Sequence, residues 1–189
     1  MAQRPTLTTD RLILRPFELS DAGNAQRLAG DKKVAATTLS IPHPYPDGAA
    51  EEWIGTHQAA FDEGNGVEFA ITDRESGELI GSIGLRISRE HAHAELGYWI
   101  GVPHWGNGYA TEAGRAVIDY GFRELSLRRI HAHHAPRNPA SGRVLEKLGM
   151  RPEGVMREHI FKWGEFEDCV LYGLLRSEYD SDSASAARR

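Results

Sequence analysis

Residues 105–110, Trp-Gly-Asn-Gly-Tyr-Ala, join an apolar stretch to an amphipathic stretch that begins near Thr111. A glycine-bearing turn between a strand and a helix N-terminus exposes backbone N–H groups, and the helix dipole adds positive potential there. Gly106 and Gly108 lack a Cβ atom, so the backbone can approach an anion closely. These features favour binding of a phosphate or pyrophosphate. The alternative is a tight strand-to-helix turn that binds no ligand.

The same segment does not match the two common nucleotide-binding motifs. A Walker A loop needs G-x-x-x-x-G-K-[ST], which the sequence lacks. A Rossmann fingerprint needs a third glycine where Thr111 stands, and an acidic residue about 20 positions further on. The strand expected there ends in His131–His134 instead. An ATP-type or dinucleotide site therefore has little support.

Acidic and histidine side chains alternate on two segments that we expect to be strands. His91, His93 and Glu95 are spaced by two residues, as are His131 and His133, and this spacing places side chains on one face of a strand. Metal sites use such spacing, but a polar groove wall explains it equally, and we expect no metal site. A carboxylate or imidazole there can also accept a proton, and Glu95 is the strongest candidate.

Five segments of the chain, taken in order, resemble one known family: Thr8–Pro16, Glu52–Ile54, Glu95–Gly101, Trp105–Ala113 and Asn138–Met150. They are similar to the opening strand, second helix, fourth strand, pyrophosphate loop and following helix of the GNAT superfamily of acetyl-CoA-dependent N-acetyltransferases. Within it, the chain most resembles the RimJ/RimL type, which acetylates protein N-terminal amines or small amines. The resemblance covers nearly the whole chain.

The resemblance implies that acetyl-CoA is a co-substrate and indicates which residues contact it. The backbone of residues 98–100 would pair with the pantetheine arm, the loop would hold the pyrophosphate, and the helix-capping Asn138 would add a contact. The superfamily often has Gln or Arg at the first loop position, where this chain has Trp105. The predicted cofactor-binding residues are Tyr98, Trp99, Ile100, Trp105, Gly106, Asn107, Gly108, Tyr109, Ala110, Thr111 and Asn138.

Acetyl transfer from a thioester to an amine requires loss of an amine proton, a polarised carbonyl and a leaving thiolate. An alkyl amine has a pKa of roughly 10 and so arrives charged. We expect Glu95 to act as general base through water or to hold the ammonium, with His93 or His133 relaying protons. Many superfamily members use a Tyr as acid where Leu145 stands, so Ser141 is the remaining candidate to donate to the sulfur. The alternatives are an exposed strand carboxylate and an ordinary first-turn helix serine.

The elements that must position these residues can be read from capping and periodicity. Apolar and β-branched stretches predict strands at 11–15, 67–72, 79–87, 93–100 and 129–133, and two final strands around a turn at 163–164. Helices are predicted from Ser20 or Asp21 to Ala29, at 49–63, from the 106–110 loop to about 125, and from Asn138 to Gly149. The proline-rich loop 41–48 and the helix that carries Trp53 are candidate walls of the substrate site, but the favoured interpretation is a plain surface connection with Trp53 in the core. The pattern is an α/β (α+β) layer fold with a mostly antiparallel sheet.

Length, charge and composition limit the remaining possibilities. The 189 residues suit one domain, which we place at 1–176, and the Ser/Ala/Asp-rich stretch 177–189 reads as a flexible tail. A net charge of −5 disfavours nucleic-acid binding, and no apolar run is long enough to span a membrane. The single cysteine, Cys169, permits no internal disulfide. With no secretory signal evident, we expect a cytoplasmic enzyme, and the resemblance implies a possible homodimer.

The sequence leaves the acceptor open. A protein N-terminal amine is expected from the RimJ/RimL resemblance, and an amino acid, polyamine or antibiotic is the alternative. A third possibility is a non-catalytic chain that only binds acyl-CoA. Substitution of Glu95 and Ser141 would separate the catalytic from the non-catalytic interpretation.

Overall fold

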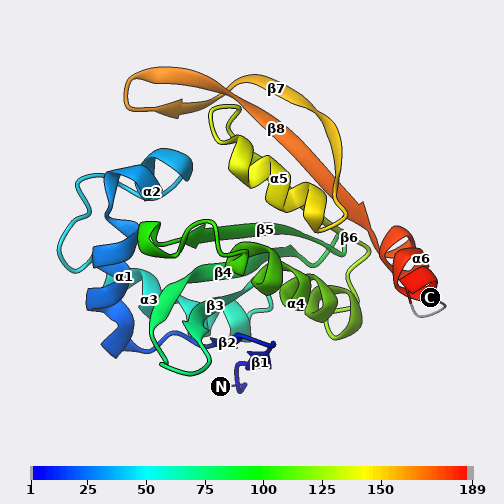
Figure 1. The fold of residues 1–189 in the computed structure, drawn as a ribbon, viewed down its shortest axis with the longest axis horizontal. Helices are drawn as coiled ribbons and strands as arrows, with labels where there is room; N and C mark the ends of the chain where they lie inside the picture. The colour runs from blue at the N-terminus through cyan, green and yellow to red at the C-terminus, as the bar shows by residue number, and fades with distance from the viewer. Residues whose placement is uncertain (1, 187–189) are drawn as a thin grey trace.

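The computed structural model describes residues 2–186, which form eight strands and six α-helices around one central sheet (Figure 1). The strand order is β1-β2-β3-β4-β5-β6-β8-β7, and every neighbouring pair is antiparallel except β5 and β6. The mixed, mostly antiparallel fold predicted from the sequence is thus confirmed. The strands are β1 (Leu7–Thr8), β2 (Leu12–Arg15), β3 (Gly66–Asp73), β4 (Leu79–Ser88), β5 (His93–Ile100), β6 (Arg129–His134), β7 (Arg151–Lys162) and β8 (Glu165–Leu175).

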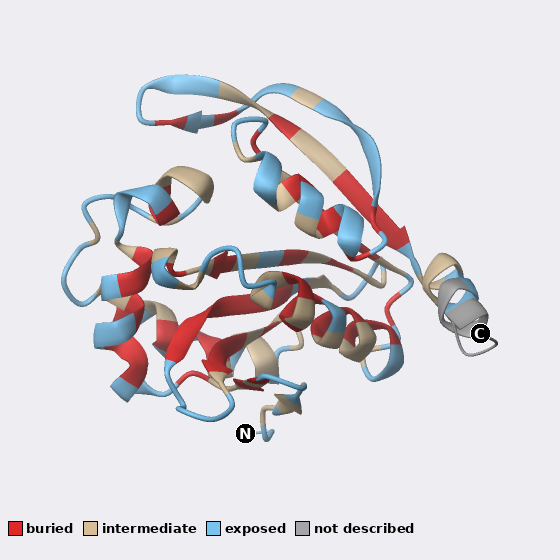
Figure 2. Cartoon of the chain, viewed as in Figure 1, coloured by how far each residue is buried: buried red, intermediate tan, exposed pale blue. Residues whose placement is uncertain are grey.

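Helices cover both faces of the sheet. The helices are α1 (Ala22–Ala29), α2 (Lys32–Thr37), α3 (Ala49–Asp62), α4 (Tyr109–Arg123), α5 (Pro139–Lys147) and α6 (Arg176–Ala186), with short 3₁₀ turns at Leu19–Asp21 and Val102–His104. The larger core lies between the sheet and α4 and α5, and a smaller core lies under α1 and α3. Both cores appear as buried segments on the inner sides of these elements in Figure 2.

Alternation along the central strands assigns each side chain to one face. In β3, Val67 and Phe69 belong to the core under α4, whereas Ala70 belongs to the core under α1 and α3. In β5, Leu96 belongs to the core under α4, and Trp99 belongs to the core under α1 and α3. The sheet therefore separates an α4/α5 side from an α1/α3 side, and a ligand that contacts both must pass through or around it.

The parallel pairing between β5 and β6 is short and opens such a passage. It runs from His93 opposite Arg129 to Glu95 opposite His131, and no further residue pairs join the two strands in the described part of the chain. Beyond Glu95, β6 pairs only with β8. The two strands are hence free to separate, which leaves one side of residues 96–100 as a strand edge that an extended ligand can pair with.

The best-marked helix of the sequence forms as predicted. The Asn138 side chain accepts a hydrogen bond from the Ser141 N–H at 3.2 Å, Pro139 begins α5, and Gly149 follows the helix with φ at +81°. These are the N-cap, N1 and C-terminal glycine positions that the local sequence specifies. The bounds of α3 and α4 also fall within a few residues of their predicted ones.

Two segments differ from the sequence predictions. The helix α2 was not expected; its N-cap Asp31 accepts a hydrogen bond from the Lys33 N–H at 2.7 Å. The stretch from Ser177, expected as a flexible tail, is helical as far as Ala186 in α6. The Tyr179 ring packs 5.1 Å from that of Phe122, which anchors the helix despite its Ser-rich composition. Residues 187–189 lie outside the described part of the chain.

Candidate active site

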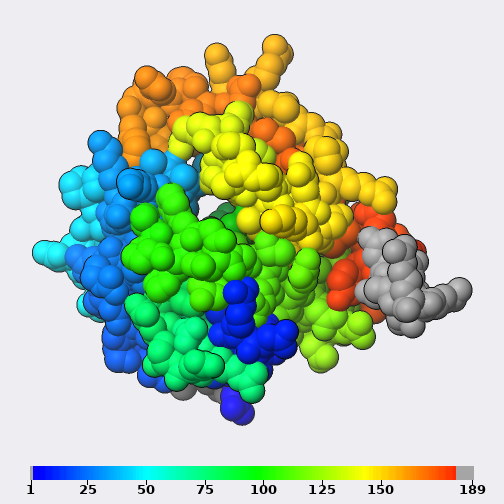
Figure 3. All heavy atoms as spheres, viewed as in Figure 1, coloured from blue at the N-terminus to red at the C-terminus, as the bar shows by residue number. Residues whose placement is uncertain are grey.

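One cavity of about 720 Å³ joins the two sides of the sheet at the gap between β5 and β6. Its α4/α5 side is lined by the glycine loop and by the first turns of α4 and α5, and its α1/α3 side by β3, β4, α2 and α3. Figure 3 shows the surface opening between α5, in yellow, and the green atoms of β5 and the following loop. We call the first part the donor end and the second part the acceptor end.

The glycine loop bends sharply before it enters α4 at the donor end. Gly106 and Gly108 have φ values of +81° and +80°, a region that L side chains rarely adopt. Trp105 donates its indole N–H to the Ile100 carbonyl at 2.6 Å and so ties the loop to β5. The predicted cofactor-binding residues all line the cavity except Asn107, whose amide instead donates to the His104 carbonyl at 3.2 Å.

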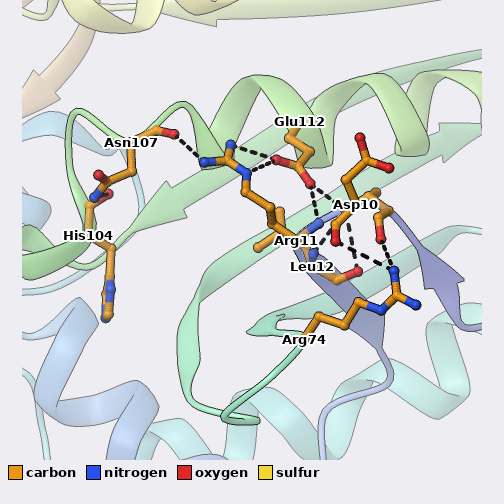
Figure 4. A network of polar contacts seen from close by, with 8 residues as sticks. Asp10, Arg11, Leu12, Arg74, His104, Asn107 and Glu112 are labelled. Carbon is orange, nitrogen blue, oxygen red and sulfur yellow. Dashed lines mark hydrogen bonds and ion pairs between the residues drawn. The ribbon is translucent and has the colours of Figure 1, made fainter.

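The turn between β1 and β2 fastens this loop through the guanidinium of Arg11 (Figure 4). Arg11 donates to the Asn107 carbonyl at 3.1 Å and to the Glu112 carboxylate at 2.7 Å, and it lies 4.8 Å from the Tyr109 ring centre. Glu112 also accepts from the Thr9 hydroxyl at 2.7 Å. The loop is consequently held from outside the cavity, with its backbone N–H groups left to face a ligand.

Two cations missed by the sequence analysis line the donor end. Arg143 and Lys147 lie one turn apart on α5 and both line the cavity. Together with the N-terminus of α4 they make the donor end suited to a phosphorylated ligand. Their i, i+4 spacing after the Asn138 cap was the signal that could have identified them.

Ser141 and Tyr98 form a hydroxyl pair at the junction of the two ends. The Tyr98 and Ser141 oxygens are 2.7 Å apart, and both residues line the cavity. Burial raises the pKa of Tyr98 to about 12, so the phenol stays protonated. The fully buried Leu145 has no acid group to offer, as expected. The sequence analysis gave Tyr98 a role only through its backbone. That its side chain pairs with Ser141 becomes evident only when β5 and α5 are placed together.

Glu95 faces the acceptor end and pairs with His133. Its Oε1 atom lies 3.1 Å from His133 Nδ1, and its Oε2 atom lies 3.5 Å from the Arg86 guanidinium. The hydrogen bond from His133 lowers the pKa of Glu95 below its ordinary value. Both Glu95 and His133 line the cavity, but His93 does not. Of the two histidines predicted to relay protons, the structure therefore places His133 beside Glu95 and leaves His93 outside the cavity.

The remaining histidines do not assemble a metal site. The His93 ring lies 5.8 Å from that of His91 and 5.2 Å from that of His131. In the part of the chain that the structure describes, no group of three potential ligands is close enough to hold a metal ion.

A second acidic residue, Glu68, lines the acceptor end and was missed by the sequence analysis. The Ser82 hydroxyl donates to its carboxyl group, and burial raises its pKa to about 7. The only hint in the sequence is one acidic residue within an otherwise apolar strand, Val67–Ile71.

The walls of the acceptor end come from α2, the residues after it, and α3. Val34 and residues 37–40 form one wall, and Trp53, Thr56 and His57 form another. Trp53 both lines the cavity and packs against the smaller core, whereas no residue of the loop 41–48 lines the cavity. Burial lowers the pKa of His57 to about 4, so its ring is neutral at physiological pH.

The β7–β8 hairpin reaches across to α2 and closes this wall from above (Figure 1). Lys162 near the hairpin tip is buried and donates to the backbone carbonyls of Ala35 and Thr38. Asn138 adds a hydrogen bond from its amide to the Thr37 carbonyl at 3.3 Å. The α2 segment is thereby held against both the hairpin and the start of α5.

None of the helices in residues 2–186 is long and apolar enough to cross a membrane.

Comparison with known proteins identifies the family. Residues 11–151 match the Acetyltransferase (GNAT) domain family. The chain is 37% identical to an uncharacterized N-acetyltransferase, p20, of Bacillus licheniformis over 92% of this chain and 98% of that protein. It is 31% identical to the [ribosomal protein uS5]-alanine N-acetyltransferase of Escherichia coli, over 92% of each chain.

A solved structure shares the fold. The spermidine N-acetyltransferase of Vibrio cholerae, in complex with CoA and spermine, superposes with a TM-score of 0.78 at 26% identity, covering 90% of this chain and 99% of that one. The donor end described above has the backbone donors and cations that CoA phosphates require. On the match to its domain, the likeness to its members and the geometry of the cavity, this chain belongs to the GNAT family of N-acetyltransferases, enzymes that use acetyl-CoA as acetyl donor.

Proposed function

We propose that this enzyme transfers an acetyl group from acetyl-CoA directly to a protein N-terminal amine, in a ternary complex of the RimJ/RimL type. The observation that carries the proposal is the single cavity that joins the glycine loop to Glu95. A direct transfer needs both substrates in one continuous space. The uS5-alanine N-acetyltransferase, similar over nearly its whole length, supports a protein acceptor. A ribosomal acceptor would place the enzyme in the cytoplasm, and homodimer formation stays a prediction.

The chain's own residues divide the work by position. The loop residues 106–111 bind the pyrophosphate, and Arg143 and Lys147 supply positive charge beside it. The free edge of β5 pairs with the pantetheine arm, which passes between β5 and β6. Ser141, with Tyr98 behind it, donates a hydrogen bond to the departing sulfur. Glu95, held by His133 and ionised, faces the incoming ammonium as base through water or as its counter-charge.

A polyamine is the second candidate acceptor. The spermidine N-acetyltransferase of Vibrio cholerae shares the fold at 26% identity, and two carboxyl groups, Glu68 and Glu95, line the acceptor end here. A small molecule with several ammonium groups would be attracted to such a surface.

The experiment that tests the proposal has two stages. Thermal unfolding is measured with acetyl-CoA, CoA and NAD; a ligand at about 100 times its Kd adds roughly 2.7 kcal/mol, or on the order of 5–10 °C for a chain of this size. Turnover is then measured with a peptide that begins with alanine and with spermidine. We expect stabilisation by both CoA species but not by NAD, and faster turnover of the peptide.

Each other result has a definite meaning. Faster turnover of spermidine than of the peptide would show that the acceptor is a polyamine and not a protein N-terminus. Stabilisation by acetyl-CoA without turnover of either amine would favour the non-catalytic interpretation. With the preferred acceptor, Glu95→Gln should lower kcat/KM while the stabilisation by acetyl-CoA stays unchanged, because Glu95 lies in the acceptor end.

A further inference from the structure

Glu68 lies in a row of three residues that crosses the floor of the acceptor end. It pairs with Gly84 on β4, and Gly84 pairs with Gly97 on β5. Directly opposed residues on adjacent strands present their side chains to the same face of the sheet. The two glycines have no side chains, so the Glu68 carboxyl group is the only side-chain group in this row.

The carboxyl group extends along this glycine floor toward open space. A Cβ atom at Gly84 would come within 2.0 Å of Glu68 Oε2, so the carboxyl lies directly over that glycine. A Cβ atom at Gly97 would meet nothing within 4 Å. The open space above Gly97 adjoins Glu95, which lies two positions before it on the same face of β5, whereas Tyr98 faces the α4/α5 side. A reacting amine held by Glu95 on this face would therefore be next to Glu68.

The surroundings of Glu68 raise its affinity for a proton. Its hydrogen-bond donor is the fully buried Ser82, and it makes no ion pair within residues 2–186. The charged and titratable groups that share its part of the cavity are Arg86 on β4, Glu95 on β5, His133 on β6 and His57 on α3. Burial raises the pKa of Glu68 to about 7, with Ser82 and Arg86 acting in the opposite direction.

Glu95 differs from Glu68 in the property that a base needs. His133 and Arg86 hold its charge, so the pKa of Glu95 is lowered and its affinity for a proton is weak. A general base works best when its pKa lies near the working pH. Glu68 meets this condition, and Glu95 is better suited to hold a positive charge.

We propose that Glu68 is the general base that takes the proton from the acceptor ammonium, while Glu95 holds the ammonium in place. The inference deepens the proposed acetyl transfer and rests on it. The ammonium gives one proton to Glu68, and the freed electron pair of nitrogen forms the bond to the acetyl carbon. The carbon–sulfur bond breaks with its electron pair on sulfur. The second proton lost by nitrogen balances the one that sulfur gains through Ser141, and Glu68 then releases its proton to solvent.

The test is the pH dependence of kcat/KM for the acceptor, measured from pH 5.5 to 9.5 in the wild type, Glu68→Gln and Glu95→Gln. The wild type should show a rising limb with its midpoint near pH 7, where Glu68 loses its proton. Glu68→Gln should lower the rate at pH 7 by roughly 10²- to 10³-fold and lose that limb. Glu95→Gln should raise KM for the acceptor but keep the limb.

A third variant and a stability measurement separate a catalytic from a structural role. Ser82→Ala removes a hydrogen bond that lowers the pKa of Glu68, so the limb should move to higher pH. A carboxyl group with a raised pKa destabilises the folded state as pH rises from about 4.5 through 7. Glu68→Gln should therefore unfold at a higher temperature than the wild type at pH 8.5, with no such gain at pH 4.5.

The outcomes distinguish failure of the role of Glu68 from failure of the proposed acetyl transfer. If the wild type acetylates an amine but Glu68→Gln keeps the limb and loses less than threefold in rate, Glu68 is not the base and the proposed function stands. The same holds if Glu95→Gln is the variant that loses the limb. If the wild type acetylates neither the peptide nor spermidine, the proposed function and the role of Glu68 both fail.

Discussion

At the scale of single residues, the hydroxyl pair of Tyr98 and Ser141 is proposed to donate a hydrogen bond to the leaving sulfur. A hydrogen bond to a charged group contributes about 1.5–3 kcal/mol, so Ser141→Ala should lower kcat by roughly 10- to 100-fold. Tyr98→Phe should cost less, because the serine hydroxyl remains. Steady-state kinetics with acetyl-CoA measures both.

A hydroxyl elsewhere in the same cavity provides the control for this prediction. Ser40 lines the acceptor end away from the pair, and Ser40→Ala should leave kcat near the wild-type value. If Ser141→Ala has the wild-type kcat, Ser141 does not take part in the reaction.

The site residues that sequence reasoning identified are those whose signal is local. Glu95 lies in an alternating strand, and Ser141 follows an N-cap by three residues, so both could be picked out along the chain. Glu68 and the role of the Tyr98 side chain could not, because they depend on partners 14 and 43 residues away, Ser82 and Ser141. A strand's sequence indicates which side chains share a face but does not indicate what that face will meet.

At the scale of elements, the turn between β1 and β2, which carries Arg11, acts on the donor loop from outside. Arg11→Ala removes the hydrogen bond to the Asn107 carbonyl and the contact with Tyr109. The loop should then be less ordered before it binds, and KM for acetyl-CoA should rise roughly five- to tenfold, because each 1.4 kcal/mol of lost binding is tenfold. Acceptor KM should change little.

The matched control is a neighbouring arginine that does not touch the loop. Arg74 donates to the Thr9 carbonyl at 3.2 Å in the same network (Figure 4). Arg74→Ala should leave KM for acetyl-CoA unchanged, and an equal increase in both variants would show that the effect is general loosening of the strand.

The predictability of elements follows the same division between local and distant causes. The helix α5 is specified by its own cap, proline and closing glycine, and the sequence predicted it. The six-residue α2 is too short to be stable from local signals alone. Lys162, more than 120 residues away, donates to the carbonyls of Ala35 and Thr38 at its C-terminal end. The helix α6 likewise depends on Tyr179 meeting Phe122, which its own composition does not reveal.

At the scale of the whole molecule, Lys162 joins the last hairpin to the wall of the acceptor end. Lys162→Met keeps most of the length of the side chain but removes the ammonium group that donates to the carbonyls of Ala35 and Thr38. The α2 wall should loosen, so KM for the acceptor should rise several-fold and the free energy of unfolding should fall by about 1–3 kcal/mol. Stabilisation by acetyl-CoA should stay the same.

An exposed lysine on the same wall controls for loss of charge. Lys33 lies on the outer side of α2, and Lys33→Met should change neither quantity. Kinetics with varied acceptor and thermal unfolding with acetyl-CoA make the comparison, and an unchanged acceptor KM in Lys162→Met would show that the hairpin does not shape this wall.

The two ends of the cavity are encoded by different stretches of chain. The walls specific to the acceptor end come mainly from residues 34–40 and 53–60, whereas the donor end comes from residues 98–147. Mutations that accumulate in the earlier stretch can thus change which amine is accepted without disturbing the site for acetyl-CoA. Descendants of one ancestral gene can in this way acquire new amine acceptors through changes confined to these two short stretches.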